Sequence, residues 1–121
     1  MTLELRSITK RFGDRDVLRN LDLRVADGEC VALLGPSGCG KSTALRLIAG
    51  LDDPDQGSIS INGEDVVAIP AERRRVGMVF QSYALFPHLN VRKNLELGLR
   101  IRGSRAAERD ERISNILEVL Q

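Results

Sequence analysis

The segment Gly35–Thr43, with the sequence GPSGCGKST, constrains the fold of this chain more than any other feature. It fits the pattern G-x-x-x-x-G-K-[ST], and its glycines at positions 35, 38 and 40 allow a tight backbone turn with positive φ. Successive N–H groups of such a turn point into one hollow, where they can hold an anion. A helix that begins near Lys41 would turn the positive end of its dipole toward the same hollow. We therefore interpret the segment as a phosphate-binding loop.

The residues of this loop have distinct predicted roles. The Lys41 ammonium would reach the β and γ phosphates of a nucleotide, and the Ser42 hydroxyl would ligate Mg²⁺. An ordinary glycine-rich turn between a strand and a helix is the alternative interpretation. The residues predicted to hold the nucleotide here are Gly35, Pro36, Ser37, Gly38, Cys39, Gly40, Lys41, Ser42 and Thr43.

The sequence on either side of the loop favours phosphate binding. The apolar run Cys30–Leu34 predicts a buried strand before the loop, and residues 44–49 predict a helix after it that ends at Gly50. Strand, glycine loop and helix in this order form the context that the motif requires.

Composition limits the classes of protein that remain. A chain of 121 residues has room for one domain at most, with a modest core. Its net charge of +1 gives no basic footprint for nucleic acid. No apolar run is long enough to span a bilayer, so any role at a membrane would be peripheral. The two cysteines, Cys30 and Cys39, do not resemble a disulfide framework, which favours the cytosol.

Two alternating segments precede the loop. Residues Leu3–Ile8 and Val17–Val25 alternate apolar and polar side chains, which predicts two antiparallel strands. Phe12 lies between them in a polar stretch, where its ring could stack on a nucleotide base or pack at the edge of the core. The residues alone leave this choice open.

The middle of the chain predicts further strands. Ser58–Ile61 predicts a short strand that ends in the tight turn Asn62–Gly63. The apolar run Val76–Phe80 predicts a buried strand beside the phosphate-loop strand, and the basic run Arg73–Arg75 before it predicts a solvated face. Gln81 follows this run, at the strand end where ligands bind in open α/β sheets.

The last forty residues predict an apolar loop and two helices. Ser82–Leu89 is apolar and interrupted by proline, so it either packs on its own domain or docks onto a partner. Asn90 is a plausible N-cap for a helix over Val91–Ile101. Gly103 interrupts the pattern, and Ser104 could cap a second helix over Arg105–Gln121. The apolar stripe of that helix finds no partner in the sequence; it consists of Ile113, Ile116, Leu117 and Leu120.

Taken together, these residues resemble the N-terminal part of an ATP-binding-cassette (ABC) transporter ATPase. Phe12, ahead of Gly13, resembles the aromatic residue that stacks on adenine, and Gly35–Thr43 resembles the Walker A loop. Gln81 resembles the Q-loop glutamine, which senses Mg²⁺ and the γ-phosphate. The resemblance implies ATP and Mg²⁺ as cofactors, Lys41 and Gln81 as catalytic residues, and Ser42 and Gln81 as metal contacts.

The resemblance also implies a fold class and a division of the chain. The fold is α/β: an incomplete P-loop NTPase-like core of the ABC ATPase type with an N-terminal antiparallel β portion. Residues 1–101 correspond to the N-terminal part of the nucleotide-binding domain. Residues 102–121 correspond to the truncated start of the helical subdomain.

Two longer segments, Val31–Thr43 and Val79–His88, are similar to ATPase subunits of bacterial and archaeal importers for sugars, polyamines, ferric iron and sulfate. In such systems the region after the Q-loop receives a helix of the membrane subunit, which favours docking of transmembrane permease subunits on Tyr83–Leu89. The resemblance further implies a homodimer of ATPase subunits. It also implies a cytoplasmic location, peripheral on the inner face of the cell membrane.

The departures from the family pattern limit what this chain is expected to do. The signature motif, the Walker B aspartate, the catalytic glutamate and the switch histidine do not occur in the 121 residues. We therefore weigh an importer ATPase, represented by its N-terminal portion, against a module that binds Mg-ATP weakly or not at all without turnover. A third alternative is another P-loop protein, such as a small kinase.

Overall fold

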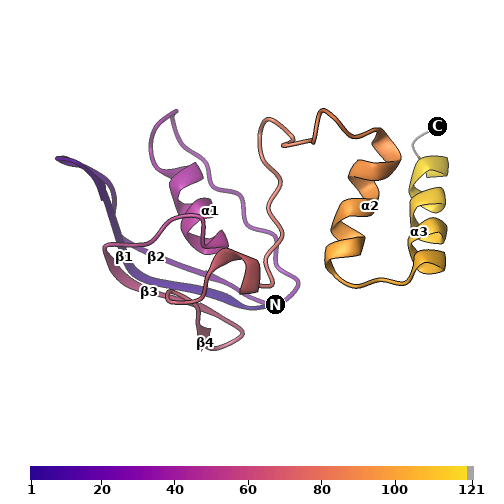
Figure 1. The fold of residues 1–121 in the computed structure, drawn as a ribbon. Helices are drawn as coiled ribbons and strands as arrows, with labels where there is room; N and C mark the ends of the chain where they lie inside the picture. Colours follow the sequence, from indigo (N-terminus) through magenta and orange to yellow (C-terminus); the bar gives the residue numbers. More distant parts are fainter. Residues whose placement is uncertain (120–121) are drawn as a thin grey trace. The chain divides into compact units, whose positions relative to one another are not determined.

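The computed structural model describes residues 1–119, which form two compact units. The first unit is Met1–Met78, and the second begins at Val79. Figure 1 shows the strands and the first helix in the first unit and two further helices in the second. The predicted boundary at residue 102 separates two parts of the family's nucleotide-binding domain, and it stays a prediction.

The first unit is built on one antiparallel sheet with the strand order β2-β1-β3-β4. Every neighbouring pair is antiparallel, which confirms the predicted antiparallel opening of the chain. The turn at Asn62–Gly63, with φ of 53° and 82°, joins the last two strands. The bounds are β1 Leu3–Phe12, β2 Arg15–Val25, β3 Gln56–Ile61 and β4 Glu64–Asp65.

A β-bulge keeps the apolar residues of β1 on one face. Leu3, Leu5 and Ile8 are all buried, although strict alternation would place Ile8 on the opposite face from Leu5. The register against β2 shifts between Leu5 and Ile8, and Ser7 takes a positive φ of 48°. The Ser7 N–H donates to the Asp22 carboxylate at 2.7 Å. The extra residue turns Ile8 back into the core.

Helix α1, Lys41–Ala49, lies over one face of this sheet (Figure 1). It begins at the predicted Lys41 and ends at the predicted Gly50, which takes a left-handed conformation. Ala44, Leu47 and Ile48 are buried among side chains of the strands. The sheet therefore fixes the helix that carries the phosphate-binding motif.

The basic run is not uniformly solvated as predicted, because its middle residue is buried. Arg74 follows the short 3₁₀ helix η1, Ala71–Arg73, and only 6% of its surface is exposed. Its Nη1 donates to the carbonyls of Leu47 at 2.6 Å and Ile48 at 3.2 Å. Nε and Nη2 donate to two further carbonyls, those of Ile69 and Val67. Burial lowers the pKa of the guanidinium, and these bonds compensate its lost hydration.

The two predicted buried strands are not present in the described structure. Cys30–Leu34 and Val76–Phe80 have no regular secondary structure, and most of their residues are exposed. Neither segment belongs to the sheet of β1 to β4. A strand forms only with hydrogen-bonded neighbours, so an apolar run by itself does not specify one. Cys30 is consequently exposed instead of buried.

The second unit contains α2, Val91–Ile101, and α3, Ala106–Val119. Asn90 caps α2 as predicted, since its Oδ1 accepts from the Lys93 N–H at 2.9 Å. Gly103, with φ of 75°, interrupts the helical pattern as predicted. Among the described residues, no helix is long and apolar enough to cross a membrane.

The apolar stripe of α3 finds a partner that the sequence interpretation missed. Ile113 is buried, and Leu95 and Leu99 of α2 line a groove together with Ile113 and Ile116. Ion pairs Arg92–Asp110 and Arg109–Glu96 also join the two helices, at 2.7 and 3.2 Å. Leu120 and Gln121, at the end of the predicted helix, lie outside the described residues.

Candidate phosphate-binding site

The backbone of Gly35–Thr43 has the conformation that the motif predicts. Gly35, Gly38 and Gly40 take φ values of 156°, 77° and 98°, as their type allows. A Cβ on Gly40 would lie 2.7 Å from Leu18 Cδ2 and 2.9 Å from the Val17 carbonyl oxygen of β2. The loop therefore passes too close to the sheet for any larger residue at position 40.

The N-terminus of α1 has features that favour the binding of an anion. Gly40 occupies the N-cap without a side-chain hydrogen bond, and the first turn contains no acidic residue. The first intrahelical bond of this turn is made by the Ala44 N–H to the Gly40 carbonyl at 2.9 Å. The N–H groups of Lys41, Ser42 and Thr43 precede it and have no acceptor within the helix. These donors and the helix dipole fit the phosphates of a nucleotide.

Lys41 closes over the loop that precedes it. Its Nζ donates to the carbonyl oxygens of Gly35 at 2.8 Å and Pro36 at 2.7 Å, and lies 3.5 Å from Cys39 Sγ. The ammonium is thus held at the hollow by neutral acceptors. A phosphate oxygen, which forms a charge-assisted bond, is a stronger partner than either carbonyl. Ser42 is exposed beside Lys41, where its hydroxyl is accessible.

Phe12 ends β1 outside the core. Its side chain is 51% exposed, and the Lys10 ammonium lies 5.2 Å from the ring centroid. An exposed aromatic ring with one face near a cation is available for stacking. The described geometry does not place the ring at the edge of the core, the alternative that the residues had left open.

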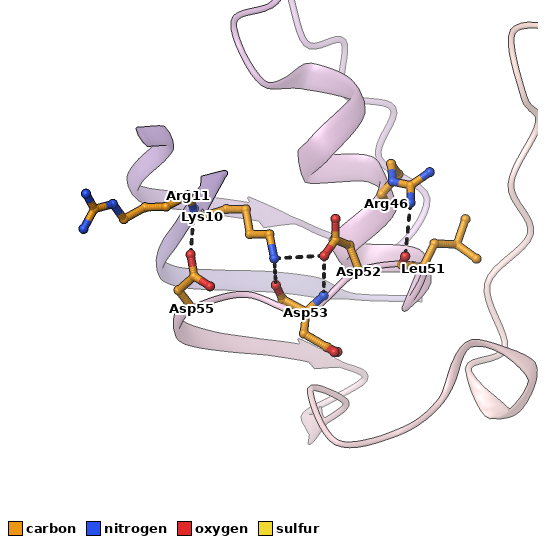
Figure 2. Close-up of polar contacts among 7 residues, drawn as sticks. All are labelled: Lys10, Arg11, Arg46, Leu51, Asp52, Asp53 and Asp55. Carbon is orange, nitrogen blue, oxygen red and sulfur yellow. Dashed lines mark hydrogen bonds and ion pairs between the residues drawn. The ribbon is translucent and has the colours of Figure 1, made fainter. Parts of the chain in front are cut away.

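Lys10 contacts both the Phe12 ring and the loop that follows α1. Figure 2 shows its contacts with that loop. The Lys10 Nζ lies 2.9 Å from the Asp52 carboxylate and donates to the Asp53 carbonyl at 2.6 Å. This hydrogen bond from Lys10 lowers the pKa of Asp52. From the sequence, only Phe12 was identified as a candidate site residue, and Lys10 was missed. A lysine two positions before an aromatic residue on one strand is a signal that could have revealed it.

Gln81 and the apolar loop belong to the second unit. Gln81 lies in a turn over residues 81–84, and its side chain is exposed. Tyr83 and Ala84 in this turn take φ values of 60° and 46°, which are unusual for residues with a Cβ. Tyr83, Leu85 and Phe86 are exposed. Self-packing, the first alternative for this loop, therefore leaves much of its apolar surface uncovered.

Asn94 stabilises the end of this loop, a role that the sequence interpretation missed. Its Oδ1 accepts from the Phe86 N–H at 2.9 Å, and its Nδ2 donates to the carbonyls of Phe86, Leu89 and Asn90. The sequence signal for this role was a polar residue on the apolar face of a helix predicted to be amphipathic. His88, which packs edge-on against Phe86 at 6.0 Å, is exposed.

The glycine loop and the helix N-terminus without a side-chain cap are typical of the class of proteins that bind phosphate groups. The particular family follows from comparison: residues 18–121 match the family described as ABC transporter, and the chain belongs to it.

Three curated relatives are about half identical to this chain. The sulfate/thiosulfate import ATP-binding protein CysA of Synechocystis sp. is 49% identical over 100% of this chain and 34% of the relative. The spermidine/putrescine import ATP-binding protein PotA of Pasteurella multocida is 48% identical, over 98% and 32%. The Fe(3+) ions import ATP-binding protein FbpC of Photorhabdus laumondii is 50% identical, over 98% and 34%. The chain thus spans about a third of the length of these relatives.

Among solved structures, the chain is similar to a dimeric post-hydrolysis state of the ATP-binding cassette MJ0796 bound to ADP and Pi. The identity is 34% and the TM-score 0.83, over 96% of this chain and 56% of that one. A second dimeric structure of MJ0796, described as a bacterial ABC transporter cassette, gives 33% identity and a TM-score of 0.80. These similarities confirm the predicted fold class, an incomplete α/β cassette with an antiparallel β portion.

Proposed function

We propose that this chain is the N-terminal part of a cytoplasmic ATP-binding subunit of an importer, which couples ATP binding and hydrolysis to solute uptake. The observation that carries the proposal is the uncapped N-terminus of α1 behind a glycine loop with positive φ at positions 35, 38 and 40. The import ATP-binding names of the relatives support the same conclusion.

In this proposal the loop and α1 hold the phosphates of ATP. Lys41 exchanges its two carbonyl acceptors for phosphate oxygens and neutralises their charge. Ser42 and Gln81 are the proposed Mg²⁺ contacts. A bound Mg²⁺ ion supplies charge neutralisation for phosphoryl transfer. The ring of Phe12 holds the base by stacking.

We further propose that the 121-residue chain binds Mg-ATP weakly and hydrolyses none. The carboxylates that the family uses for hydrolysis do not occur in this sequence. Two copies of the longer protein would enclose ATP between them, in line with the dimeric cassettes of similar fold.

The loop Tyr83–Leu89 is the proposed docking site for permease subunits, at the inner face of the membrane. Its residues Leu85, Phe86, Pro87 and Leu89 line a groove of about 240 Å³ together with apolar residues of α2. Exposed apolar surface of this kind is typical of an interface.

The test is ATP turnover by the longer product of the same gene, with and without the Lys41 side chain. Replacement Lys41→Ala should abolish phosphate release, while Lys93→Ala, on exposed α2 surface, should leave it unchanged. Undiminished turnover in Lys41→Ala would refute the proposed function. Turnover by the 121-residue chain that depends on Lys41 would refute only its proposed inactivity.

A further inference from the structure

Phe12 and the phosphate-binding loop lie at two different places in the first unit, yet one nucleotide must contact both. The aromatic ring ends β1, whereas the loop leads into α1. For stacking to add to phosphate binding, the ring has to be fixed relative to the helix before the nucleotide arrives. The contacts of Lys10 provide such a connection.

Lys10 is held more firmly than an ordinary surface lysine. Its side chain is 12% exposed, and it bonds to both the Asp52 carboxylate and the Asp53 carbonyl. The Asp52 carboxylate also accepts from the Asp53 N–H at 3.0 Å, so the acceptor is itself oriented (Figure 2). Such an arrangement fixes the position of the ammonium, which an exposed ion pair does not.

The loop that receives Lys10 is tied to α1 on one side and to β1 on the other. The Leu51 N–H donates to the Arg46 carbonyl at 2.9 Å, and the Arg46 guanidinium donates to the Leu51 carbonyl at 3.3 Å. At the other end, the Arg11 N–H donates to the Asp55 carboxylate at 2.6 Å (Figure 2). Contacts therefore run without interruption from α1 to the end of β1.

The Lys10 ammonium also lies over the Phe12 ring, 5.2 Å from its centroid. A cation at this distance is attracted to the face of an aromatic ring and restrains its rotation. Because one face of the ring is occupied by Lys10, a base must approach from the other. Half of the Phe12 side chain is exposed, which leaves room for this approach.

We propose that Lys10 is a positioning residue for the nucleotide base: it orients the Phe12 ring and fixes it relative to α1 through Asp52 and Asp53. This inference rests on the proposed function, since it assumes that the loop holds a nucleotide. Lys10 does not contact the phosphates in this role. Its loss therefore weakens only the part of the binding that depends on the base.

The test compares two ligands, Mg-ATP and Mg-tripolyphosphate, because the second keeps the phosphates and lacks the base. Dissociation constants are measured by NMR titration of the chain, a method suited to weak binding. The variants are Lys10→Met, which keeps the apolar stem, Lys10→Arg, which keeps the charge, and Phe12→Ala. Lys93→Met, on the exposed surface of α2, is the matched control.

We expect Lys10→Met to weaken ATP binding by about three- to tenfold and to leave tripolyphosphate binding unchanged. Lys10→Arg should bind ATP nearly as tightly as the unaltered chain. In the Phe12→Ala background the Lys10→Met change should have no further effect, as a double-mutant cycle requires for residues that act together. Lys93→Met should resemble the unaltered chain with both ligands.

Equal weakening of both ligands by Lys10→Met would overturn the inference, because Lys10 would then act on the fold as a whole. No weakening of either ligand would also overturn it. An unaltered chain that binds ATP no more tightly than tripolyphosphate would overturn it as well, and would leave the proposed phosphate site intact. An unaltered chain that binds neither would refute the proposed nucleotide site itself, and the inference with it.

Discussion

The Arg74 Nη1 lies 2.6 Å from the carbonyl oxygen of Leu47, in the last turn of the helix that follows the phosphate-binding loop. Helix C-termini have carbonyls without intrahelical partners and a negative dipole end, so a buried guanidinium is a suitable cap. The contact fixes the far end of α1, while the close approach of Gly40 to β2 fixes its beginning.

Replacement Arg74→Met should lower the free energy of unfolding by about 2–4 kcal/mol, because it removes four hydrogen bonds to carbonyl oxygens, two of them buried and two partly buried. Urea denaturation followed by circular dichroism measures the change. The neighbouring Arg75 is exposed, so Arg75→Met should stay within about 0.5 kcal/mol of the unaltered chain. Similar stabilities for the two variants would show that the Arg74 contacts do not hold the helix.

Two glycine replacements should have opposite effects on stability. Gly40→Ala places a Cβ within 2.9 Å of the Val17 carbonyl oxygen at a φ of 98°, so it should destabilise the chain by about 1–3 kcal/mol. Gly98→Ala, in α2, meets no atom within 4 Å and should stabilise it by about 0.5–1 kcal/mol. Thermal unfolding of both variants distinguishes them. A stable Gly40→Ala chain would contradict the close packing of the loop against β2.

The depressed pKa of Asp52 gives a prediction for acid pH. The hydrogen bond from Lys10 lowers this pKa in the folded chain below its ordinary value of 3.8. The unfolded chain therefore takes up the proton first as the pH falls. The stabilisation by the carboxylate is complete above the ordinary value and is lost as the pH falls through the lower, folded value.

Asp52→Asn measures this contribution. The difference in the free energy of unfolding between this variant and the unaltered chain should be constant near pH 7 and should shrink below about pH 4. Asp14, which forms no ion pair among residues 1–119, serves as the control, and Asp14→Asn should show a small difference throughout. A difference in unfolding free energy for Asp52→Asn that grows toward acid pH would contradict the predicted pH dependence.

Asn94 should control the exposed apolar loop before α2. Asn94→Ala removes the side chain that bonds to Phe86 and Leu89, so the Phe86 amide should exchange its hydrogen about tenfold faster or more. Hydrogen exchange detected by NMR gives the rate for each amide. Asn115, exposed on α3, is the control, and its replacement by alanine should leave the rate at Phe86 unchanged. An unchanged exchange rate of the Phe86 amide in Asn94→Ala would show that a group other than Asn94 holds this loop.

The sequence predicted those elements whose signal is local. Helix α1 begins at Lys41 and ends at Gly50 as expected, and α2 begins after its Asn90 cap as expected. Capping residues and glycines act on their own neighbours, so a single sequence contains the information. The antiparallel pair β1 and β2 was found for the same reason, because its alternation is visible within each strand.

The parts that could not be predicted depend on partners distant in the sequence. The run Val76–Phe80 is apolar enough for a buried strand, yet its segment is irregular in the described structure. Arg74 lies in a basic run, which predicts exposure to solvent. Its burial follows instead from hydrogen bonds to Leu47 and Ile48, which are distant in the sequence. Hydrophobicity and charge define what a segment can do, while the packing of other segments decides the outcome.

The central claim of this account is that Lys41 and the loop before it hold the phosphates of ATP. Equilibrium binding of Mg-ATP to the 121-residue chain, measured by NMR titration for the unaltered chain, Lys41→Met and Lys93→Met, tests it most directly. We predict that Lys93→Met binds like the unaltered chain and that Lys41→Met binds at least about tenfold more weakly, since it loses a charge-assisted bond to phosphate. Equal affinity of the unaltered chain and Lys41→Met would contradict the claim.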